Sequence, residues 1–107
     1  MKTLANAFSL QMLSEAVTAT TFERLTLAEM REVAKGGVNS AIGHPDTAAV
    51  LSEMIGVDVP ANRVNIKLNP GDVVYVAQLM GGRLPEGTTT LPEGFAFKFI
   101  KVTCLGE

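Results

Sequence analysis

The chain has 107 residues, 47% of them hydrophobic and 19% charged, and its formal net charge at pH 7 is −2. This length and composition are typical of one folded domain over 1–107 and exclude a disordered chain. Nine basic residues against eleven acidic ones give no broad positive surface, so we expect no binding to long nucleic acids. No apolar run reaches the roughly 18–20 residues of a membrane span. We therefore expect no membrane association and a cytoplasmic location, the host cytoplasm for a viral protein.

The first third of the chain predicts two strands and a helix. Residues 3–8 alternate weakly between apolar and polar side chains, and residues 16–24 are rich in threonine and apolar residues, so both stretches predict strands. Thr26 and Glu29 have the spacing of a capping box, and two glycines stand at positions 36 and 37. These start and stop signals predict a helix over 27–35.

The middle of the chain predicts a loop followed by a second helix. The segment 39–43, "NSAIG", is expected to be a loop. Apolar residues then recur at helical spacing from Pro45 to Ile55, proline suits the first turn, and Gly56 can close the helix. The only histidine of the chain, His44, is thereby placed immediately before a helix.

The last part of the chain predicts a hairpin and a final strand. Residues 63–68 alternate, and "NPGD" at 69–72 is a strong turn signal before the apolar run 73–80, so a β-hairpin is expected. A glycine-rich bend with "RLPEG" at 83–87 leads to a strand over 95–102. Two helices among about five strands predict an α/β (α+β) fold with one mixed, mostly antiparallel sheet and the helices packed on one face.

Several kinds of catalytic site are excluded by what one chain lacks. A single cysteine, Cys104, cannot form a disulfide or a thiolate metal cluster within one chain. One histidine and one cysteine also leave too few residues for a zinc site or a nucleophilic triad. Neither GxxxxGK[ST] nor GxGxxG occurs, so nucleotide triphosphate chemistry is not expected. We expect neither a metal nor a cofactor.

His44 is the strongest candidate for chemistry. Histidine gains or loses a proton near neutral pH, and the unpaired N–H groups at a helix N-terminus favour an anion such as phosphate. A carboxylate such as Asp46 or Glu86 could keep the imidazole charged. The alternative is that His44 caps the helix or packs against it without a chemical role.

Other polar residues have both a functional and a structural interpretation. Arg83 and Glu86 would be presented by one sharp turn, or that turn is ordinary protein surface. The forked guanidinium of Arg63 suits a phosphate if it faces a cleft, but the residue could equally lie on the wet face of a strand. Asn6 and Ser9 could bind a ligand or serve as turn and cap residues.

Five stretches of the chain, taken in series, carry a family resemblance. They are "LANAFSLQML" at 4–13, "SAIGH" at 40–44, "NRVNIKL" at 62–68, "YVAQ" at 75–78 and "RLPEG" at 83–87. Together they resemble the small viral anti-CRISPR ring nuclease family. Members of that family are homodimers that bind cyclic tetra-adenylate, the second messenger of type III CRISPR defence, and cut it into linear di-adenylate without a metal ion. The resemblance implies a metal-independent phosphodiesterase that switches off antiviral signalling, built on a mixed sheet flanked by helices.

The resemblance also implies a role for each matching residue. His44 would be the general acid that protonates the leaving 5′-oxygen when a ribose 2′-hydroxyl attacks the adjacent phosphorus, giving a 2′,3′-cyclic phosphate. Glu86 would orient or charge His44, and Arg83 would hold the substrate. The positions that match polar residues around the nucleotide are Asn6, Ser9, Arg63, Gln78 and Thr47.

One departure from the family pattern bears on the function. Between Gln78 and Arg83 the chain has "LMGG", one residue more than the pattern, with two glycines. The sequence therefore leaves open in which direction the Arg83 side chain points. The alternative to a nuclease is a non-catalytic module of the same fold that sequesters a cyclic nucleotide or binds a protein partner.

Overall fold

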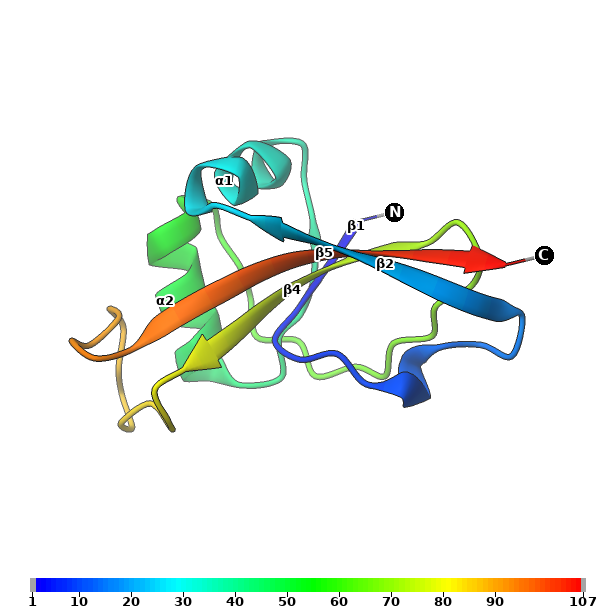
Figure 1. Ribbon diagram of the computed structural model, residues 1–107. Helices are drawn as coiled ribbons and strands as arrows, with labels where there is room; N and C mark the ends of the chain where they lie inside the picture. Colours follow the sequence, from blue (N-terminus) through cyan, green and yellow to red (C-terminus); the bar gives the residue numbers. More distant parts are fainter. Residues whose placement is uncertain (1, 107) are drawn as a thin grey trace.

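The computed structural model describes residues 2–106 as one mixed sheet with two helices (Figure 1). A short 3-10 turn, η1, follows the first strand. The elements in chain order are β1 (Lys2–Ala5), η1 (Leu10–Met12), β2 (Val17–Leu25), α1 (Leu27–Lys35), β3 (Asn39–Ala41), α2 (Pro45–Ile55), β4 (Val73–Met80) and β5 (Ala96–Gly106).

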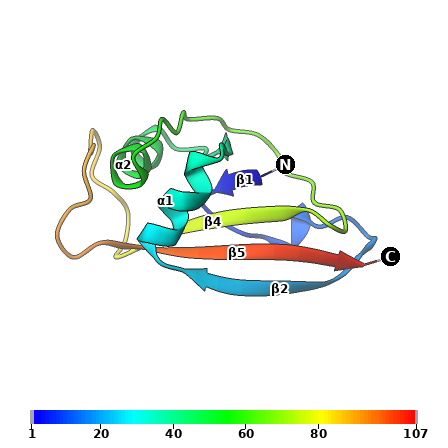
Figure 2. The same ribbon diagram turned by 90° about the horizontal axis from the view of Figure 1, so that it is seen from above.

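The sheet has the strand order β2-β5-β4-β1-β3. β1 is parallel to both of its neighbours, β3 and β4, while β5 runs antiparallel to β4 and to β2. The antiparallel pairings are the long ones, so the prediction of a mixed, mostly antiparallel sheet is confirmed. Figure 2 shows β1, β4, β5 and β2 side by side in this order, with α1 crossing in front of them.

Both helices pack on the same face of the sheet, as predicted. Met30 of α1 and Leu51 of α2 are fully buried, and they share one apolar cluster with Leu4, Tyr75 and Phe99 from three strands. Because each helix presents its apolar side to this cluster, burial of that side is the main stabilising term. The cluster fixes where α2 begins and therefore where His44 lies.

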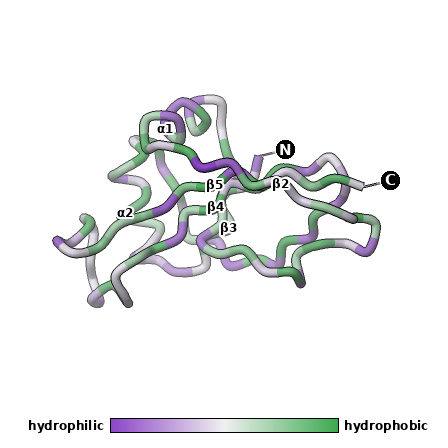
Figure 3. The backbone as a smooth tube through the Cα atoms, in the orientation of Figure 1, coloured by the Kyte–Doolittle hydropathy of each residue, from purple (hydrophilic) through white to green (hydrophobic). Residues whose placement is uncertain are grey.

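The opposite face of the sheet is covered by irregular chain segments instead of helices. A second apolar cluster joins Val74, Val76 and Val102 of the central strands to Met12 and Leu68. Figure 3 shows hydrophilic stretches dispersed among hydrophobic ones over the whole tube. The sheet therefore has two apolar faces. One packs against the helices, and the other packs against the segments 6–14 and 62–72.

The predicted helix ends are confirmed. The Thr26 side chain accepts from the Glu29 N–H at 3.1 Å, and the Glu29 carboxylate accepts from the Thr26 N–H at 2.9 Å, which completes the capping box. Pro45 occupies the first turn of α2, and Gly56 closes that helix with φ of 85°. Such caps stabilise a helix by about 1 kcal/mol each.

The predicted hairpin of 63–68 with 73–80 is wrong. Residues 73–80 do form β4, but both edges of β4 are taken, by β1 and by β5, so no edge is left for a hairpin partner. Of the residues in 63–68, only Leu68 makes a bridge, to Leu13. The apolar alternation that suggested a strand is used for packing, since Ile66 and Leu68 belong to the second cluster.

Three further boundaries differ from the sequence prediction. Residues 39–41 form β3 where a loop was expected, because this short stretch pairs in parallel with β1, a contact that local sequence does not encode. The first strand ends at Ala5, before the predicted 8. The last strand continues to Gly106 instead of ending at 102, because its far half pairs with β2.

Candidate functional site

The predicted site residues converge where β1 and β3 end. Asn6 follows β1, and Gly43 and His44 follow β3 just before α2 begins. Parallel neighbouring strands bring their carboxyl ends to the same edge of a sheet, which is the usual position of ligand sites in folds with parallel strands. The site therefore lies at the carboxyl ends of β1 and β3.

A network of hydrogen bonds holds the segment after α2 against β3. The Asn62 N–H donates to the Ile42 carbonyl at 2.8 Å, and the Asn62 side-chain amide donates to the Ser40 carbonyl at 2.8 Å. The Ser40 hydroxyl in turn donates to the Pro60 carbonyl at 2.6 Å. These bonds take the place of a strand ladder, and they deliver the next residue, Arg63, to the site.

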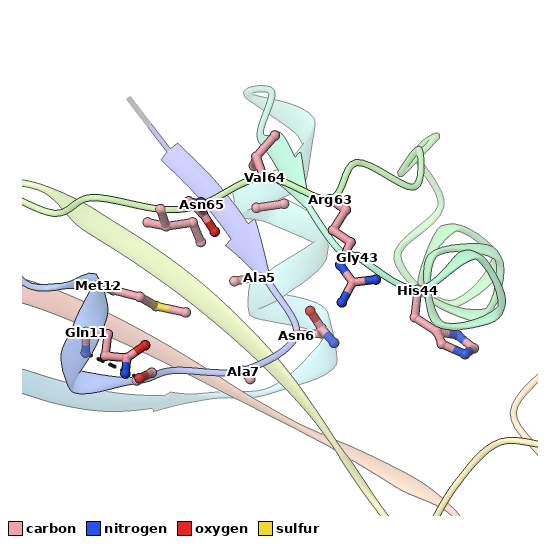
Figure 4. Close-up of a pocket in the computed structure, with 13 residues that line it drawn as sticks. Ala5, Asn6, Ala7, Gln11, Met12, Gly43, His44, Arg63, Val64 and Asn65 are labelled. Carbon is pink, nitrogen blue, oxygen red and sulfur yellow. Dashed lines mark hydrogen bonds between the residues drawn. The ribbon is translucent and has the colours of Figure 1, made fainter.

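Arg63 reaches the site by lying over a glycine. A Cβ added at Gly43 would lie 3.3 Å from the Arg63 Cγ, so a larger residue there would push the arginine stem outwards. Figure 4 shows the guanidinium of Arg63 and the amide of Asn6 in the same part of the site, with the His44 ring turned away from both. In the "IGH" sequence, the glycine lets the Arg63 side chain pack close to the backbone, and the histidine follows directly after it.

His44 is the N-cap residue of α2. Its Nδ1 accepts from the Thr47 N–H at 3.4 Å, a long and therefore weak hydrogen bond. An imidazole nitrogen that accepts carries no hydrogen, so the hydrogen of the neutral ring is on Nε2. The ring itself is exposed, whereas Thr47 is only 7% exposed. The structural interpretation, a cap, is confirmed, and it leaves Nε2 free for another partner.

The largest hollow at the site has a volume of about 670 Å³ and a lining of both polar and apolar residues (Figure 4). Ser9 also caps η1, where its hydroxyl accepts from the Gln11 N–H at 3.3 Å. Gln11 and Asn65 were not among the predicted site residues, although both lie inside stretches that carry the family resemblance. The polar and charged lining residues are Asn6, Ser9, Gln11, His44, Arg63 and Asn65.

Two further hollows meet at the same histidine. One of about 600 Å³ is lined by His44, Asp46, Arg83 and Glu86, together with apolar neighbours. A smaller one of about 250 Å³ lies between Asn6, His44, Thr47 and Arg83. His44 lines all three hollows and Arg83 lines two of them. The longer "LMGG" stretch therefore still delivers Arg83 to the histidine, which answers the question left by the sequence.

The loop that carries Arg83 and Glu86 is fixed at two points. Leu84 is only 5% exposed, although its neighbours in the loop are exposed. The Asp46 carboxylate, in the first turn of α2, accepts from the Gly87 N–H at 3.2 Å. A buried leucine on one side of Glu86 and a hydrogen bond on the other hold the loop against the start of α2.

The loop begins with two glycines whose backbone conformation is unfavourable for any other residue. Gly81 and Gly82 have φ of 113° and 116°, a region that disfavours any side chain. A Cβ at Gly81 would also lie 2.7 Å from the Gly94 carbonyl oxygen, whereas a Cβ at Gly82 would meet nothing within 4 Å. Substitutions at these two glycines therefore separate the cost of backbone strain from the cost of steric overlap.

Gly81→Ala is expected to lower the free energy of unfolding by about 2 kcal/mol more than Gly82→Ala, because only the first adds a clash to the strain. Urea unfolding of the two variants and the parent measures the difference. Equal losses in the two variants would show that the contact at Gly81 relaxes at no cost.

One predicted binding residue lies apart from the others. Gln78 is exposed on β4, opposite Lys98 of β5, and lines none of the three hollows described. Its amide points from the sheet face that carries Val74 and Val76, since alternate residues of a strand share a face. Within a single chain, the site consists of the other predicted residues without Gln78.

Two general features of the described residues complete the site description. Over residues 2–106, no group of three or more His, Cys, Asp and Glu side chains is placed to hold a metal ion. Neither helix in this range has the length and apolarity needed to cross a membrane. Burial raises the pKa of the Cys104 thiol, and the charge of Asp72 adds to the effect, so this cysteine is a neutral core residue.

Comparisons with known proteins point to viral relatives. Residues 2–97 match the family model described as STIV B116-like. The chain is 41% identical over 68 residues to the uncharacterized protein ORF117 of Acidianus two-tailed virus, covering 58% of this chain and 57% of that protein. It is 35% identical over 66 residues to the uncharacterized protein 26 of Sulfolobus islandicus filamentous virus, covering 61% of this chain and 55% of that protein. The matches thus span little more than half the length of these curated relatives.

A solved viral structure has the same fold. B116 of Sulfolobus turreted icosahedral virus superposes with a TM-score of 0.79 at 28% identity, over 95% of this chain and 97% of that one. The superposition supports the mixed α+β architecture described above.

Proposed function

This chain belongs to the STIV B116-like family of small proteins from archaeal viruses, and on that premise we propose that it is a metal-independent ring nuclease. The proposed substrate is cyclic tetra-adenylate, which would be cut to linear di-adenylate and so removed as a type III CRISPR signal. The observation that carries the proposal is the meeting of three hollows at His44, with Arg63 in one of them and Arg83 in the other two.

The proposed reaction is an internal transesterification. A ribose 2′-hydroxyl attacks the adjacent phosphorus, the bond from phosphorus to the 5′-oxygen breaks, and the products carry a 2′,3′-cyclic phosphate and a 5′-hydroxyl. The 2′-hydroxyl proton passes to solvent, and His44 supplies the proton that the leaving 5′-oxygen needs. General acid catalysis of this kind contributes about 10²–10⁴-fold to a rate, and alignment of the attacking hydroxyl contributes further.

The geometry of His44 determines which nitrogen donates. Nδ1 accepts from the Thr47 N–H, so Nε2 is the nitrogen that remains for a substrate. A strong acid requires the imidazolium, which carries a hydrogen on both nitrogens and so gives up the cap. Because that bond is 3.4 Å long, its loss costs little. The released Thr47 N–H is then available to a phosphate oxygen at the helix N-terminus.

Two arginines suit the charge of a cyclic phosphodiester. Arg63 lies in the large hollow, and Arg83 lies in the two others, so cations flank His44. A guanidinium can donate two parallel hydrogen bonds to one phosphate. Glu86 shares a hollow with His44, where its carboxylate can orient the imidazole.

We further propose that two copies of the chain enclose one substrate. A ring of four identical nucleotides has a two-fold axis, and so does a homodimer, so each His44 would face one of two opposite phosphodiesters. Val64, at the rim of the large hollow, is 51% exposed, and Leu10, between two lining residues, is 78% exposed. Apolar side chains exposed beside a binding hollow favour association with another protein surface.

The test is product analysis with and without a metal chelator. Purified protein is incubated with cyclic tri-, tetra- and hexa-adenylate in excess chelator, and the products are identified by mass. The proposal predicts di-adenylate with a 2′,3′-cyclic phosphate from the tetra-adenylate ring at an unchanged rate. Intact rings under all conditions, or a rate that returns only with added metal, would contradict it.

A second candidate function is sequestration of the cyclic nucleotide without turnover. The observation that favours it is the cap on His44, since a neutral imidazole is a poor acid. The same experiment separates the two candidates. Tight binding of a ring that stays intact supports sequestration, whereas linear products support the nuclease.

A further inference from the structure

One side chain connects the start of α2 to the loop 81–87. The Asp46 Oδ2 accepts from the Gly87 N–H at 3.2 Å across 41 positions of sequence. Asp46 is two residues after His44, in the first turn of the helix that His44 caps. The hydrogen bond therefore joins the two chain segments that line the hollow of about 600 Å³.

The position of this bond in the loop determines what it controls. Arg83 and Glu86 are exposed, and between them Leu84 is buried. Leu84 fixes the loop next to Arg83, and the Gly87 N–H fixes it next to Glu86. Within the loop, the Thr88 N–H donates to the Pro85 carbonyl at 3.2 Å, a bond that shapes the turn without tying it to the start of α2. The place of the loop beside His44 therefore depends on these two anchors.

We propose that Asp46 is a positioning residue, which holds Arg83 and Glu86 against His44 through its bond to the Gly87 N–H. The catalytic consequence of this inference rests on the proposed function, but the structural connection does not. Asp46 acts through the loop, since the carboxylate oxygen named above is used by the backbone of Gly87. The proposal gives a role to a residue that the family resemblance did not single out.

A charge effect is the competing explanation, and one substitution separates the two. The Asp46 carboxylate lies in the same hollow as His44 and could stabilise an imidazolium directly. Asp46→Asn removes the charge but keeps an oxygen that can accept from the Gly87 N–H. Asp46→Ala removes both. If Asp46 acts through the loop, asparagine preserves its role, and if it acts by charge, asparagine fails like alanine.

The first measurement needs no substrate. Trypsin cleaves after arginine, and cleavage of the bond between Arg83 and Leu84 requires the loop to leave the body of the protein. Loss of one hydrogen bond is expected to speed this cleavage about 5-fold in Asp46→Ala. Asp46→Asn should stay within about 2-fold of the parent, as should the control Glu53→Ala, which removes the same charge from an exposed position of α2.

The second measurement asks whether loop position affects the proposed reaction. Asp46→Ala is expected to lower kcat/KM for cyclic tetra-adenylate about 5-fold, with Asp46→Asn close to the parent. In an Arg83→Ala background the same substitution should cost less, because one of the side chains it positions is already gone. Full additivity of the two substitutions would overturn the proposal.

The two measurements test the proposed function and the positioning role of Asp46 independently. If the parent protein does not cleave the ring, the proposed function is wrong, and the trypsin comparison still decides whether Asp46 holds the loop. If Asp46→Ala is cleaved no faster than Glu53→Ala, the positioning role is wrong whatever the activity. Equal behaviour of the alanine and asparagine variants of Asp46 would assign the effect to charge and would also overturn the proposal.

Discussion

Replacement of His44 by alanine is expected to slow cleavage of cyclic tetra-adenylate by about 10²–10⁴-fold and to leave binding of the ring within a few-fold of the parent. The variant loses the donor to the leaving oxygen, but Arg63 and Arg83 still line the hollows. Single-turnover rates and equilibrium titration with labelled ring measure the two effects. An alanine variant that cleaves at the parent rate would remove His44 from the mechanism.

A matched variant separates chemistry from stability at this position. His44 caps α2, so His44→Ala also loses that cap, which rests on a weak hydrogen bond of 3.4 Å. Asparagine is among the best N-cap residues but cannot act as an acid. His44→Asn is therefore predicted to be at least as stable as the parent in urea and as slow as His44→Ala. Recovery of activity by asparagine would show that the histidine serves only the helix.

Arg83→Ala is predicted to weaken binding of cyclic tetra-adenylate by about 10- to 100-fold, which corresponds to the loss of charge-assisted hydrogen bonds to a phosphate. Arg83 lines both hollows that lie between α2 and the loop, so its guanidinium is within reach of a ring seated on His44. The dissociation constant of the non-cleaving His44→Asn protein, with and without the Arg83 substitution, isolates binding from turnover.

Two controls define what Arg83 contributes. Arg83→Lys keeps the charge but loses the forked donors, so an intermediate loss is expected. Lys35→Ala removes the same charge from α1, where Lys35 is exposed and pairs with Glu32 at 2.8 Å, and it should change the dissociation constant less than 2-fold. If both arginine variants bind like the parent, the loop does not touch the substrate.

The helices were predictable from the sequence because their signals are local. The capping box at Thr26, proline in the first turn of α2 and Gly56 at its end each depend on residues within one or two turns. The pairing of strands was less predictable. The hairpin of 63–68 with 73–80 was expected from the alternation of 63–68 and the turn signal at 69–72, but both edges of β4 are taken, by β1 from the start of the chain and by β5, the next strand.

The candidate site was predictable in its residue types and less so in its connections. The position of His44 at a helix N-terminus follows from Pro45 and the helical spacing of the apolar residues after it, and the residue has the structural role that was the alternative to chemistry, that of a cap. The bond from Asp46 to Gly87 joins residues 41 positions apart, and no local pattern encodes it. Gln11 entered the site for the same reason, because η1 brings it into the lining of the hollow that Arg63 also lines.

The most direct test of the central claim, that His44 gives a proton to the leaving oxygen, uses a tetra-adenylate ring with sulfur in place of one bridging 5′-oxygen. A thiol loses its proton near pH 8.5, far below an alcohol, so a thiolate leaves without an acid. The account predicts that His44→Asn cleaves the sulfur linkage at about the parent rate while remaining about 10²–10⁴-fold slower on the oxygen linkage. An equal defect on both linkages would contradict it.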